Sequence, residues 1–334
     1  MKPWVFVVPD RSGHPSGGTR YNTALLRELG AQGAELVIVP SNELGPISAS
    51  HAEWIWVDSL YLSLVAQLAA RARGDWRARV GILLHYLPSL LSSGNAALSG
   101  AEHEALQACD ALVVTSEYMK AELSRRGYGA KPCAVVEPGC ELTLAATAPD
   151  VTSLRALMVA HVVENKGVYE LLRALATELS GSDELSLEIA GSLEVAPEYS
   201  RRCRGLLDDA PLLARSVTWL GTLDEDSTRR AYLRNNLFVS ASRSESYGMA
   251  LAEARTVGLP VIANAGGNVS ALVNRRSGGR LCANADEVAV ACVELARSAS
   301  ARAEVTALAR AEAIPPRPWA RVAEEFTERV AQFR

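Results

Sequence analysis

The sequence predicts an α/β protein of two Rossmann-like, doubly wound domains that face each other across a cleft. Short, almost wholly apolar runs alternate with helix-length segments along most of the chain. A small, polar stretch over 139–153 interrupts this alternation, which then starts again. Short runs rich in Val and Ile are typical of strands buried on both faces of a parallel sheet. Two such series indicate two domains.

The first half contains six predicted strands. They are the apolar runs Trp4–Pro9, Leu36–Pro40, Trp54–Val57, Val80–Leu84, Ala111–Val114 and Ala134–Val136. Ser and Thr favour the position before a helix because their side chains accept a backbone N–H. Thr19 is therefore expected to cap a helix that ends near Ala31, and Ser116 to cap another that reaches Arg126.

The second half repeats the pattern. The predicted strands are Leu157–Ala160, Leu185–Ala190, Val217–Leu220, Leu237–Ser240 and Pro260–Ala263, and the predicted helices include Gly167–Leu179, Asp224–Arg234 and Met249–Val257. A last helix is expected over Trp319–Phe333, where apolar residues recur at helical spacing. We place one domain at 1–145, a second at 146–315 and a C-terminal helix at 316–334, with packing back on the first domain as one option.

Composition limits the possible function. The 334 residues carry a net charge of −4, which provides no electrostatic footprint for nucleic acid. The six cysteines form no C-x-x-C pair and have no cluster of histidines beside them. We therefore expect free thiols in a reducing compartment and no structural zinc. Neither a signal peptide nor an apolar run of membrane-spanning length is evident, so the expected location is the cytoplasm.

The segment 242–268, SRSESYGMALAEARTVGLPVIANAGGN, carries the strongest functional signal. A predicted strand ends in a polar loop, and Gly248 then opens a helix. The backbone N–H groups of Gly248, Met249 and Ala250 are suited to bind phosphate. Glu253 lies further along this helix, where its carboxylate can accept hydrogen bonds from ribose hydroxyls, and Glu245 precedes the helix. The alternative is an ordinary amphipathic helix with an acidic residue near its N-terminus.

Two further strand ends carry polar residues. In LMVAHVVENKG, Lys166 opens a helix and can pair with a diphosphate, and His161 lies five residues earlier. His85 ends the strand VGILLH, where an imidazole can hydrogen-bond a sugar or a phosphate. The alternatives are a solvated lysine at a helix start and a histidine whose partners lie in the core.

The loop Pro9–Thr19, PDRSGHPSGGT, follows the first strand and precedes a helix. Gly17 and Gly18 allow the backbone to approach a phosphate or a sugar closely. The loop lacks the G-x-G-x-x-G pattern of dinucleotide-binding proteins, which disfavours a dehydrogenase. The alternative is a tight turn without a binding role.

Over nearly its full length, the chain resembles the retaining glycosyltransferase family four, which has the GT-B fold. The resemblance depends on segments that occur in the order PSGGTRYN, the strand-ending His85, CDALVVTSEYM, NKG, VTWLGTLDED and SESYGMALAEARTVGLPVIANAGGN. The last segment, with its two glutamates, is the specific one. At the position five residues before Lys166, where the family usually has arginine, this chain has His161.

The resemblance implies a role for each matching residue. Lys166 binds the donor diphosphate, Glu253 the donor ribose, and His85 lies beside the transferred sugar. Contacts to donor sugar and phosphate are implied for Glu245, Tyr247, Gly248, Met249 and Ala250. Gly17 and Gly18 are placed near the phosphate and acceptor, and Thr222 and Leu223 near the base. His161 is expected to stabilise the leaving diphosphate when protonated, with Arg20 or Arg243 able to share that role.

These roles predict a hexosyltransferase that moves a sugar from a UDP-, GDP- or ADP-linked donor to a small-molecule acceptor with retention. No D-x-D motif follows a strand, so we expect no metal, and no cofactor beyond the donor. The alternatives are a nucleotide-sugar epimerase or phosphorylase of the same fold, and an inactive nucleotide-sugar binding protein, which His161 motivates. Arg71–Arg79 contains Trp76 and four arginines and permits membrane contact, but Asp75 and its shortness favour a solvated helix end.

Overall fold

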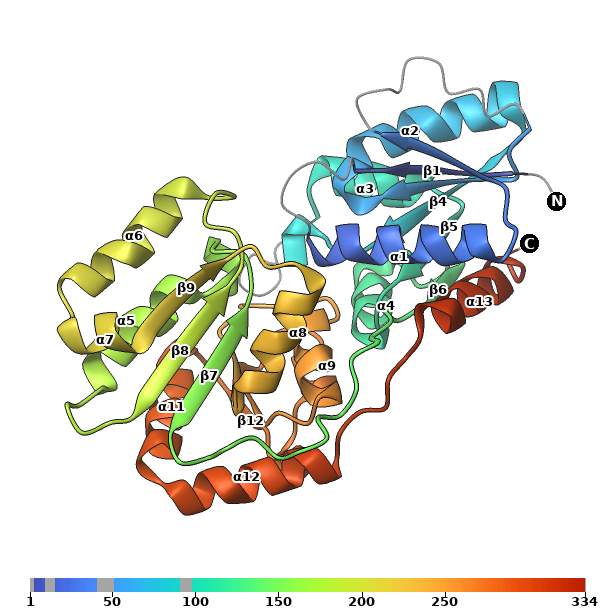
Figure 1. The fold of residues 1–334 in the computed structure, drawn as a ribbon. Helices are drawn as coiled ribbons and strands as arrows, with labels where there is room; N and C mark the ends of the chain where they lie inside the picture. The colour runs from blue at the N-terminus through green and yellow to red at the C-terminus, as the bar shows by residue number, and fades with distance from the viewer. Residues whose placement is uncertain (1–2, 10–15, 41–50, 91–97, 334) are drawn as a thin grey trace. The chain divides into compact units, whose positions relative to one another are not determined.

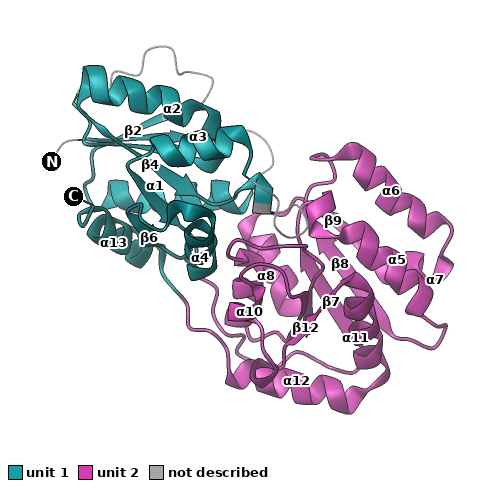
Figure 2. Ribbon diagram, turned by 180° about the vertical axis from the view of Figure 1, so that it is seen from behind, with its two compact units in different colours: residues 1–139, 317–334 teal, residues 140–316 magenta. Residues whose placement is uncertain are grey.

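A computed structural model of the chain describes residues 3–9, 16–40, 51–90 and 98–333, which form two compact α/β units (Figure 1). Unit 1 consists of residues 1–139 and 317–334, and unit 2 of residues 140–316 (Figure 2). Each unit contains a parallel sheet with helices on both faces, so the predicted fold class is confirmed. The predicted cleft between the two domains stays a prediction.

The sheet of unit 1 has the strand order β2-β1-β3-β4-β5-β6, with every neighbouring pair parallel. Its strands are β1 (Trp4–Val8), β2 (Leu36–Pro40), β3 (Trp54–Asp58), β4 (Arg79–Leu84), β5 (Ala111–Val114) and β6 (Cys133–Val135). Its helices are α1 (Gly17–Ala31), α2 (Leu62–Arg71), α3 (Gly100–Ala108), α4 (Glu117–Leu123) and α13 (Trp319–Val330). Short 3-10 or π turns lie at Ser59–Tyr61, Ala72–Trp76, Pro88–Leu90 and Ser124–Tyr128.

Alternating side chains on the strands of unit 1 point to opposite faces of the sheet. Val5, Val7, Ile55 and Val57 belong to the core under α2, α3 and α4. The aromatic residues between them point to the other face, where α13 packs beside α1 (Figure 1). Phe326 of α13 is fully buried there, with its ring centre 5.7 Å from that of Trp4, 6.2 Å from Phe6 and 5.3 Å from Trp56.

The sheet of unit 2 has the order β12-β11-β10-β7-β8-β9 and is also parallel. Its strands are β7 (Leu154–Val159), β8 (Leu185–Ala190), β9 (Val217–Gly221), β10 (Leu237–Ser240), β11 (Val261–Asn264) and β12 (Arg280–Cys282). Helices α5 (Val168–Glu178), α6 (Pro197–Asp208), α7 (Pro211–Ser216) and α11 (Ala285–Arg297) cover one face. Helices α8 (Glu225–Arg234), α9 (Met249–Thr256) and α10 (Val269–Leu272) cover the other. Helix α12 (Ala299–Ala311) and 3-10 turns at Glu164–Lys166 and Arg275–Ser277 complete the unit.

The structure divides the chain after Gly139, several residues before the predicted boundary at 145/146. The reason is that the following residues are attached to unit 2. Leu144 lies against Gly258, where a Cβ would come within 2.5 Å of the Leu144 Cδ1. Arg310 of α12 donates hydrogen bonds to the carbonyls of Ala145 and Thr147. The chain returns to unit 1 after Pro316, so the final helix belongs to unit 1.

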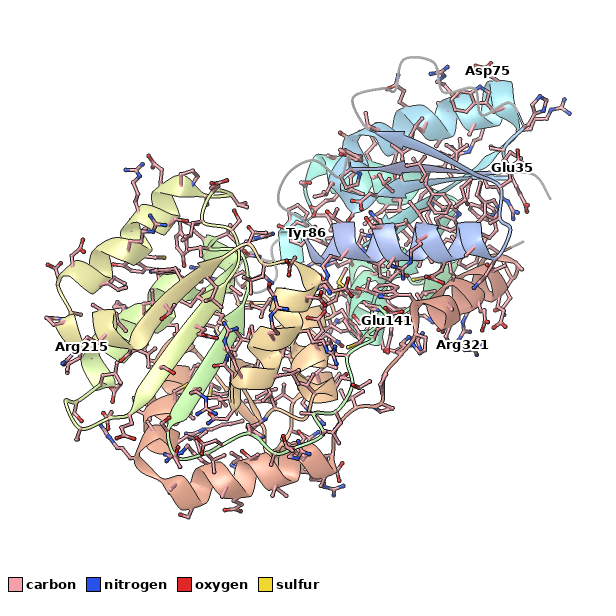
Figure 3. All side chains as sticks on the ribbon, viewed as in Figure 1. Glu35, Asp75, Tyr86, Glu141, Arg215 and Arg321 are labelled. Atoms are coloured by element: carbon pink, nitrogen blue, oxygen red, sulfur yellow. The ribbon has the colours of Figure 1, made fainter. Side chains whose placement is uncertain are left out.

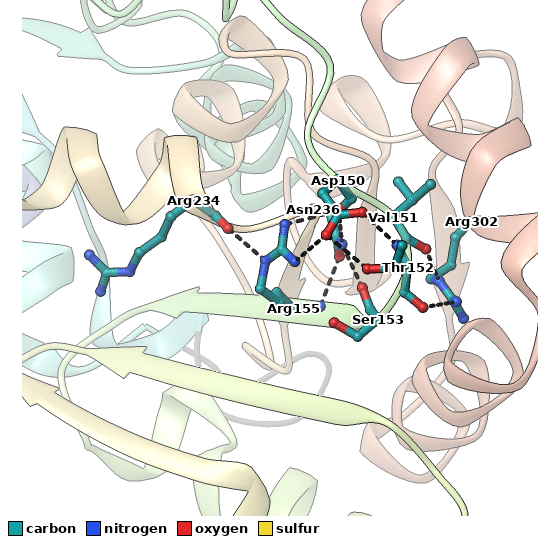
Figure 4. A network of polar contacts seen from close by, with 8 residues as sticks. All are labelled: Asp150, Val151, Thr152, Ser153, Arg155, Arg234, Asn236 and Arg302. Carbon is teal, nitrogen blue, oxygen red and sulfur yellow. Dashed lines mark hydrogen bonds and ion pairs between the residues drawn. The ribbon is translucent and has the colours of Figure 1, made fainter.

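A polar network fixes the segment that leads into β7 (Figure 4). Asn236 accepts a hydrogen bond from Arg155 N and donates to the carbonyls of Asp150 and Ser153. The guanidinium of Arg302, which is 5 % exposed, donates from Nε and Nη2 to the carbonyls at positions 151 and 152. These bonds hold residues 150–153 in front of β7 and, through Arg155 N, the start of the strand.

Two local expectations change. Thr19 was expected to cap the first helix, but Ser16 is the cap and its Oγ accepts a hydrogen bond from Thr19 N. Gly17 and Gly18 therefore lie in the first turn of α1 rather than in a loop. No element was predicted between 264 and 318, where the structure has α10, β12, α11 and α12. Strand β12 does not show as an apolar run in the sequence because it is three residues long and two of them are exposed.

Candidate functional site

The carboxyl ends of β7 and β10 form the centre of the candidate site in unit 2. From β7 the chain builds β8 and β9 on one side of the sheet, and then β10, β11 and β12 on the other. The order reverses between β7 and β10, and ligands of open α/β sheets bind outside the strands at such a point. The structure places Lys166 after β7 and Glu245 after β10. It thereby brings two predicted site residues from distant parts of the sequence to the same edge.

Lys166 and Glu245 form an ion pair at this edge. The Nζ of Lys166 lies 2.6 Å from Oε1 of Glu245, and the two side chains are 25 % and 17 % exposed. Both are thus accessible from solvent while partly shielded from it, which strengthens their mutual attraction relative to a fully exposed pair. Both residues were predicted from the sequence, but their contact was not.

The two loops that carry this pair are held together by their backbones. Arg243 N donates a hydrogen bond to the carbonyl of Asn165. Gly167 has a positive φ of 65°, and a Cβ at this position would lie 2.2 Å from the carbonyl oxygen of Ala241. Only glycine fits such a contact without a shift of the chain. The position of Lys166 is therefore fixed by the glycine that follows it.

A third loop, which follows β11, supports Glu245. Glu245 N donates to the carbonyl of Gly266, and Asn268 N donates to the carbonyl of Glu245. At Gly267, which has a φ of 71°, a Cβ would come within 2.2 Å of the Glu245 carbonyl oxygen. The backbone of Glu245 is thus clamped on both sides, and this leaves its carboxylate well positioned.

Helix α9 begins at Met249, directly after the loop that carries Glu245. The residue before it, Gly248, has a φ of 92° and provides no side-chain cap. The first backbone N–H groups of α9, at Met249 and Ala250, follow it. Further along the helix, Glu253 is only 4 % exposed and its Oε2 accepts a hydrogen bond of 2.8 Å from the Tyr232 hydroxyl. An uncapped helix start is suited to an anion, and a carboxylate oriented by a tyrosine is suited to hydroxyl groups.

His161 lies in the loop that follows β7 and contacts the loop that follows β8. Its Nδ1 accepts a hydrogen bond of 3.2 Å from the backbone N–H of Ser192, a residue that is 2 % exposed. A ring nitrogen that accepts an N–H carries no proton, so the imidazole in this arrangement is neutral, with its hydrogen on Nε2. The predicted role as a cation beside the diphosphate would require this bond to break.

This bond leads to a prediction about stability. His161→Ala removes the acceptor of a buried N–H, which we expect to lower the free energy of unfolding by about 1–3 kcal/mol. His161→Asn supplies a carbonyl oxygen near the position of Nδ1 and is expected to retain most of that stability. Thermal unfolding of the two variants checks this. Equal melting temperatures for alanine and asparagine would contradict the proposed role of Nδ1.

A cavity of about 560 Å³ opens beside these loops, at the carboxyl ends of β8 and β9. Ser192, Glu194 and Thr222 line it together with Arg201 and Arg204 of α6. Leu223, the other residue predicted near a base, packs against the core under α8 and α9. The structure thus brings Thr222, but not the Leu223 side chain, to a cavity that lies next to the partner of His161.

In unit 1, His85 follows β4 and belongs to a buried polar network. Its Nε2 lies 2.8 Å from Oδ1 of Asn22 in α1, and Nδ2 of Asn22 donates to Oδ2 of Asp58 at 2.5 Å. Burial lowers the pKa of His85, with a smaller opposing effect of Asp58, so the ring is neutral at pH 7. Tyr86 marks this strand end in Figure 3. Gly18 packs on the ring, since a Cβ there would lie 3.1 Å from the His85 Cδ2.

The other predicted residues are placed as follows. Gly17 is exposed at the first position of α1, and residues 10–15 of the predicted glycine loop lie outside the described part of the chain. Arg243, a possible substitute for the missing arginine, pairs with Glu170 at 3.0 Å. Arg20 is exposed on the first turn of α1. Tyr247 accepts a hydrogen bond from the Asn268 amide through its carbonyl.

The structure also bears on the cysteines, on possible metal ligands and on the basic segment Arg71–Arg79. The six cysteines, all within the described residues, are thiols outside any disulfide, as predicted. Within the described ranges, no group of three or more His, Cys, Asp or Glu side chains is placed to hold a metal ion. The expectation that no metal is needed stays a prediction. Trp76 is 9 % exposed with Arg71 stacked 4.5 Å above its ring, and it packs in the core of unit 1. No described helix is long and apolar enough to cross a membrane.

Several supporting residues were missed from the sequence. Asp58 ends the run WIWVD just as His85 ends VGILLH, and the two strands are neighbours, so a search for polar residues at strand ends would have found it. Asn22, Tyr232 and Asn268 carry no such signal. They lie within or at the start of helices, and only the folded chain shows that they face site residues.

The comparisons with known proteins bear on the family and on the fold. Residues 153–298, which contain all the predicted site residues of unit 2, match the family described as glycosyl transferases group 1. No curated protein sequence matches the chain. Over residues 153–298 the predicted relationship to glycosyltransferases is confirmed at the level of group 1, and membership of family four stays a prediction.

Solved structures show the same fold over the whole chain. Sucrose-phosphate synthase from Thermosynechococcus elongatus has a TM-score of 0.80 and 18 % identity, with 99 % of each chain covered. HepE from Anabaena, in complex with UDP and glucose, has a TM-score of 0.77 and 16 % identity, covering 99 % of this chain and 100 % of HepE. A glycosyltransferase from Rickettsia africae has a TM-score of 0.70, 18 % identity and coverage of 99 % and 98 %. The predicted GT-B fold is thereby confirmed.

Proposed function

We propose that this glycosyltransferase, whose residues 153–298 match group 1, transfers a hexose from a nucleotide-diphosphate sugar to a small-molecule acceptor with retention of configuration. The observation that carries the proposal is the convergence of Lys166, Glu245 and the start of α9 at the switch point of the unit 2 sheet. The UDP-bound and UDP-glucose-bound structures of HepE, which has the same fold, support a nucleotide sugar as the donor.

The donor diphosphate is proposed to lie between Lys166 and the start of α9. When the bond between the anomeric carbon and the diphosphate oxygen breaks, its electron pair leaves with the diphosphate, which gains negative charge. The Lys166 ammonium and the N–H groups of Met249 and Ala250 stabilise that charge. The acceptor oxygen bonds to the anomeric carbon, and a phosphate oxygen takes its proton. Glu245 holds the ammonium in place and is close enough to contact the sugar.

The nucleoside is proposed to extend from the diphosphate towards Glu253 and the cavity beside β8 and β9. Glu253 accepts hydrogen bonds from the ribose hydroxyls, and Tyr232 orients its carboxylate. The base occupies the cavity lined by Ser192 and Thr222. His161 contributes a neutral Nε2–H donor near the diphosphate, because its Nδ1 is engaged with Ser192.

This assignment of Glu253 predicts a loss of discrimination between ribose and deoxyribose. Thermal unfolding with UDP, GDP and ADP first identifies the preferred nucleotide, because a ligand at 100 times its dissociation constant adds about 2.7 kcal/mol of stability. Hydrogen bonds to a charged group contribute about 1.5–3 kcal/mol. The native protein should therefore bind the ribonucleotide about 10- to 100-fold more tightly than its 2′,3′-dideoxy analogue, and Glu253→Gln should bind the two more nearly alike.

Tyr232→Phe is the matched control because it keeps the ring and removes only the hydroxyl that orients Glu253. Its preference for the ribonucleotide over the 2′,3′-dideoxy analogue should lie between those of the native protein and Glu253→Gln. A Glu253→Gln protein that is folded and keeps the full preference for ribose would refute the ribose assignment. Tight binding of a nucleotide diphosphate without turnover against a broad panel of acceptors would instead favour a binding protein.

A further inference from the structure

Asp58, Asn22 and His85 form a chain of hydrogen bonds in which each atom has only one consistent role. Asp58 is 1 % exposed, and its Oδ1 accepts a hydrogen bond of 2.7 Å from Leu60 N. Its Oδ2 accepts from Nδ2 of Asn22 at 2.5 Å, which requires the amide oxygen of Asn22 to face His85. That oxygen lies 2.8 Å from Nε2 of His85, and the same Nε2 is 3.6 Å from Oδ2 of Asp58, so both neighbours favour a hydrogen on Nε2.

The direction of this chain determines where the histidine proton lies. An amide oxygen only accepts hydrogen bonds, so Nε2 of His85 must be the donor and must carry the hydrogen. Burial lowers the pKa of this imidazole, so the ring carries one proton. The other nitrogen, Nδ1, is therefore a bare lone pair. It is buried and has no hydrogen-bond partner among the described residues.

We propose that Asp58 and Asn22 are positioning residues that hold His85 as the Nε2–H tautomer, so that Nδ1 is presented as a hydrogen-bond acceptor to a hydroxyl of the bound sugar. The proposal rests on the proposed function, which supplies a sugar substrate, and adds to it the contact of a sugar hydroxyl with His85. Of the two partners expected for His85, a sugar and a phosphate, it assigns the sugar. A lone pair attracts a hydroxyl hydrogen and repels the oxygens of a phosphate.

The ring environment supports this role. His85 N donates to Oγ of Ser59, which follows Asp58 directly, so one strand end holds both the backbone and, through Asn22, the ring of His85. Gly18 lies against the ring at a distance that a side chain would not permit without a shift. An unpaired buried acceptor destabilises the protein, and a ligand hydroxyl that donates to Nδ1 removes that penalty.

The first test measures the tautomer directly in the ligand-free, full-length protein. Long-range ¹H–¹⁵N NMR spectra of the histidine rings distinguish a protonated from a bare nitrogen, and a His85→Gln variant assigns the signals. The expected result is a protonated Nε2 and a bare Nδ1 in His85. A proton on Nδ1 of the native protein would overturn the proposal, and this result requires no variant of the network to fold.

The second test reverses the hydrogen-bond chain. In Asp58→Asn, the new amide keeps its oxygen for Leu60 N and turns its NH₂ towards Asn22. Asn22 must then flip and offer its own NH₂ to Nε2, which moves the ring proton to Nδ1. The double variant Asn22→Asp/Asp58→Asn restores a carboxylate oxygen opposite Nε2 and should restore the Nε2–H form. An unchanged tautomer in Asp58→Asn would overturn the positioning role.

Activity and binding separate this proposal from the proposed function. Asp58→Asn should lower kcat/KM for sugar transfer about 10- to 100-fold, and the double variant should recover most of it. Affinity for the nucleoside diphosphate alone should not change, because that ligand is bound by residues of unit 2. An equal loss of nucleoside diphosphate affinity would overturn the assignment of Nδ1 to a sugar hydroxyl. If the native protein binds no nucleoside diphosphate at all, the proposed function fails, and the NMR result alone decides the positioning role.

Discussion

Lys166→Met is expected to reduce transfer at least about 100-fold, the largest effect of any single substitution in unit 2. A donor aimed at developing charge in a partly shielded site contributes about 2.7–4 kcal/mol to transition-state stabilisation. The substitution also leaves the Glu245 carboxylate without its partner at 2.6 Å, next to the proposed diphosphate. Calorimetric titration isolates the binding part: the native protein should prefer the nucleoside diphosphate to the monophosphate, and Lys166→Met should lose that preference.

A double-mutant cycle tests whether the pair acts as a unit. If it does, Lys166→Met/Glu245→Gln should be little less active than Lys166→Met alone, because effects of coupled residues are not additive. The matched control is Arg173→Met, which breaks an ion pair of 2.8 Å with Asp286 on the surface of the same unit. That variant should keep full activity. Full transfer by Lys166→Met would show that the diphosphate charge is held elsewhere.

Phe326→Ala is expected to cause the largest loss of stability, about 3–5 kcal/mol, because it empties a fully buried aromatic site in which the rings of Trp4, Phe6 and Trp56 converge. For a unit of this size, the melting temperature should fall by roughly 6–20 °C. Tryptophan fluorescence reports the change in unit 1, since Trp219 is the only tryptophan outside it.

Leu60→Ala is the control for this substitution, because it removes an apolar side chain that is 59 % exposed in the same unit. Its effect should stay within about 0.5 kcal/mol. A loss below about 1 kcal/mol for Phe326→Ala would mean that α13 contributes little to the core of unit 1, contrary to the packing of its rings.

The fold could be predicted largely because its central strands are buried on both faces. Runs such as Trp54–Asp58 and Leu237–Ser240 have every residue buried, so their pattern is strong and local. The pattern weakens at the edge of the sheet, where two of the three residues of β12 are exposed and the strand was missed. The boundary was placed late because the attachment of Leu144 to Gly258 depends on residues far apart in sequence.

The candidate site was predictable where function places polar residues at strand ends. His85 and His161 come within two residues of a strand end, and Lys166 and Glu245 lie in the segments that connect a strand to the next helix. These positions are visible in the sequence. The partners of these residues could not be predicted from the sequence. The pairing of Lys166 with Glu245 and the direction of the chain through Asn22 depend on strand order and side-chain orientation, which no local pattern encodes. The neutral state of His161 likewise follows from one backbone N–H on a neighbouring loop.

The chain passes from unit 1 to unit 2 after Gly139 and returns to unit 1 after Pro316, and this sets the order in which the two units are synthesised. Unit 2 is one continuous stretch, but the sheet of unit 1 waits for α13, which is encoded after all of unit 2. The intervening 140–316 takes roughly 10–35 s to translate at about 5–20 residues per second. During that time the nascent chain exposes Trp4, Phe6 and Trp56 without Phe326 to cover them. We therefore expect a chaperone to bind the nascent chain at this aromatic face until α13 has been synthesised.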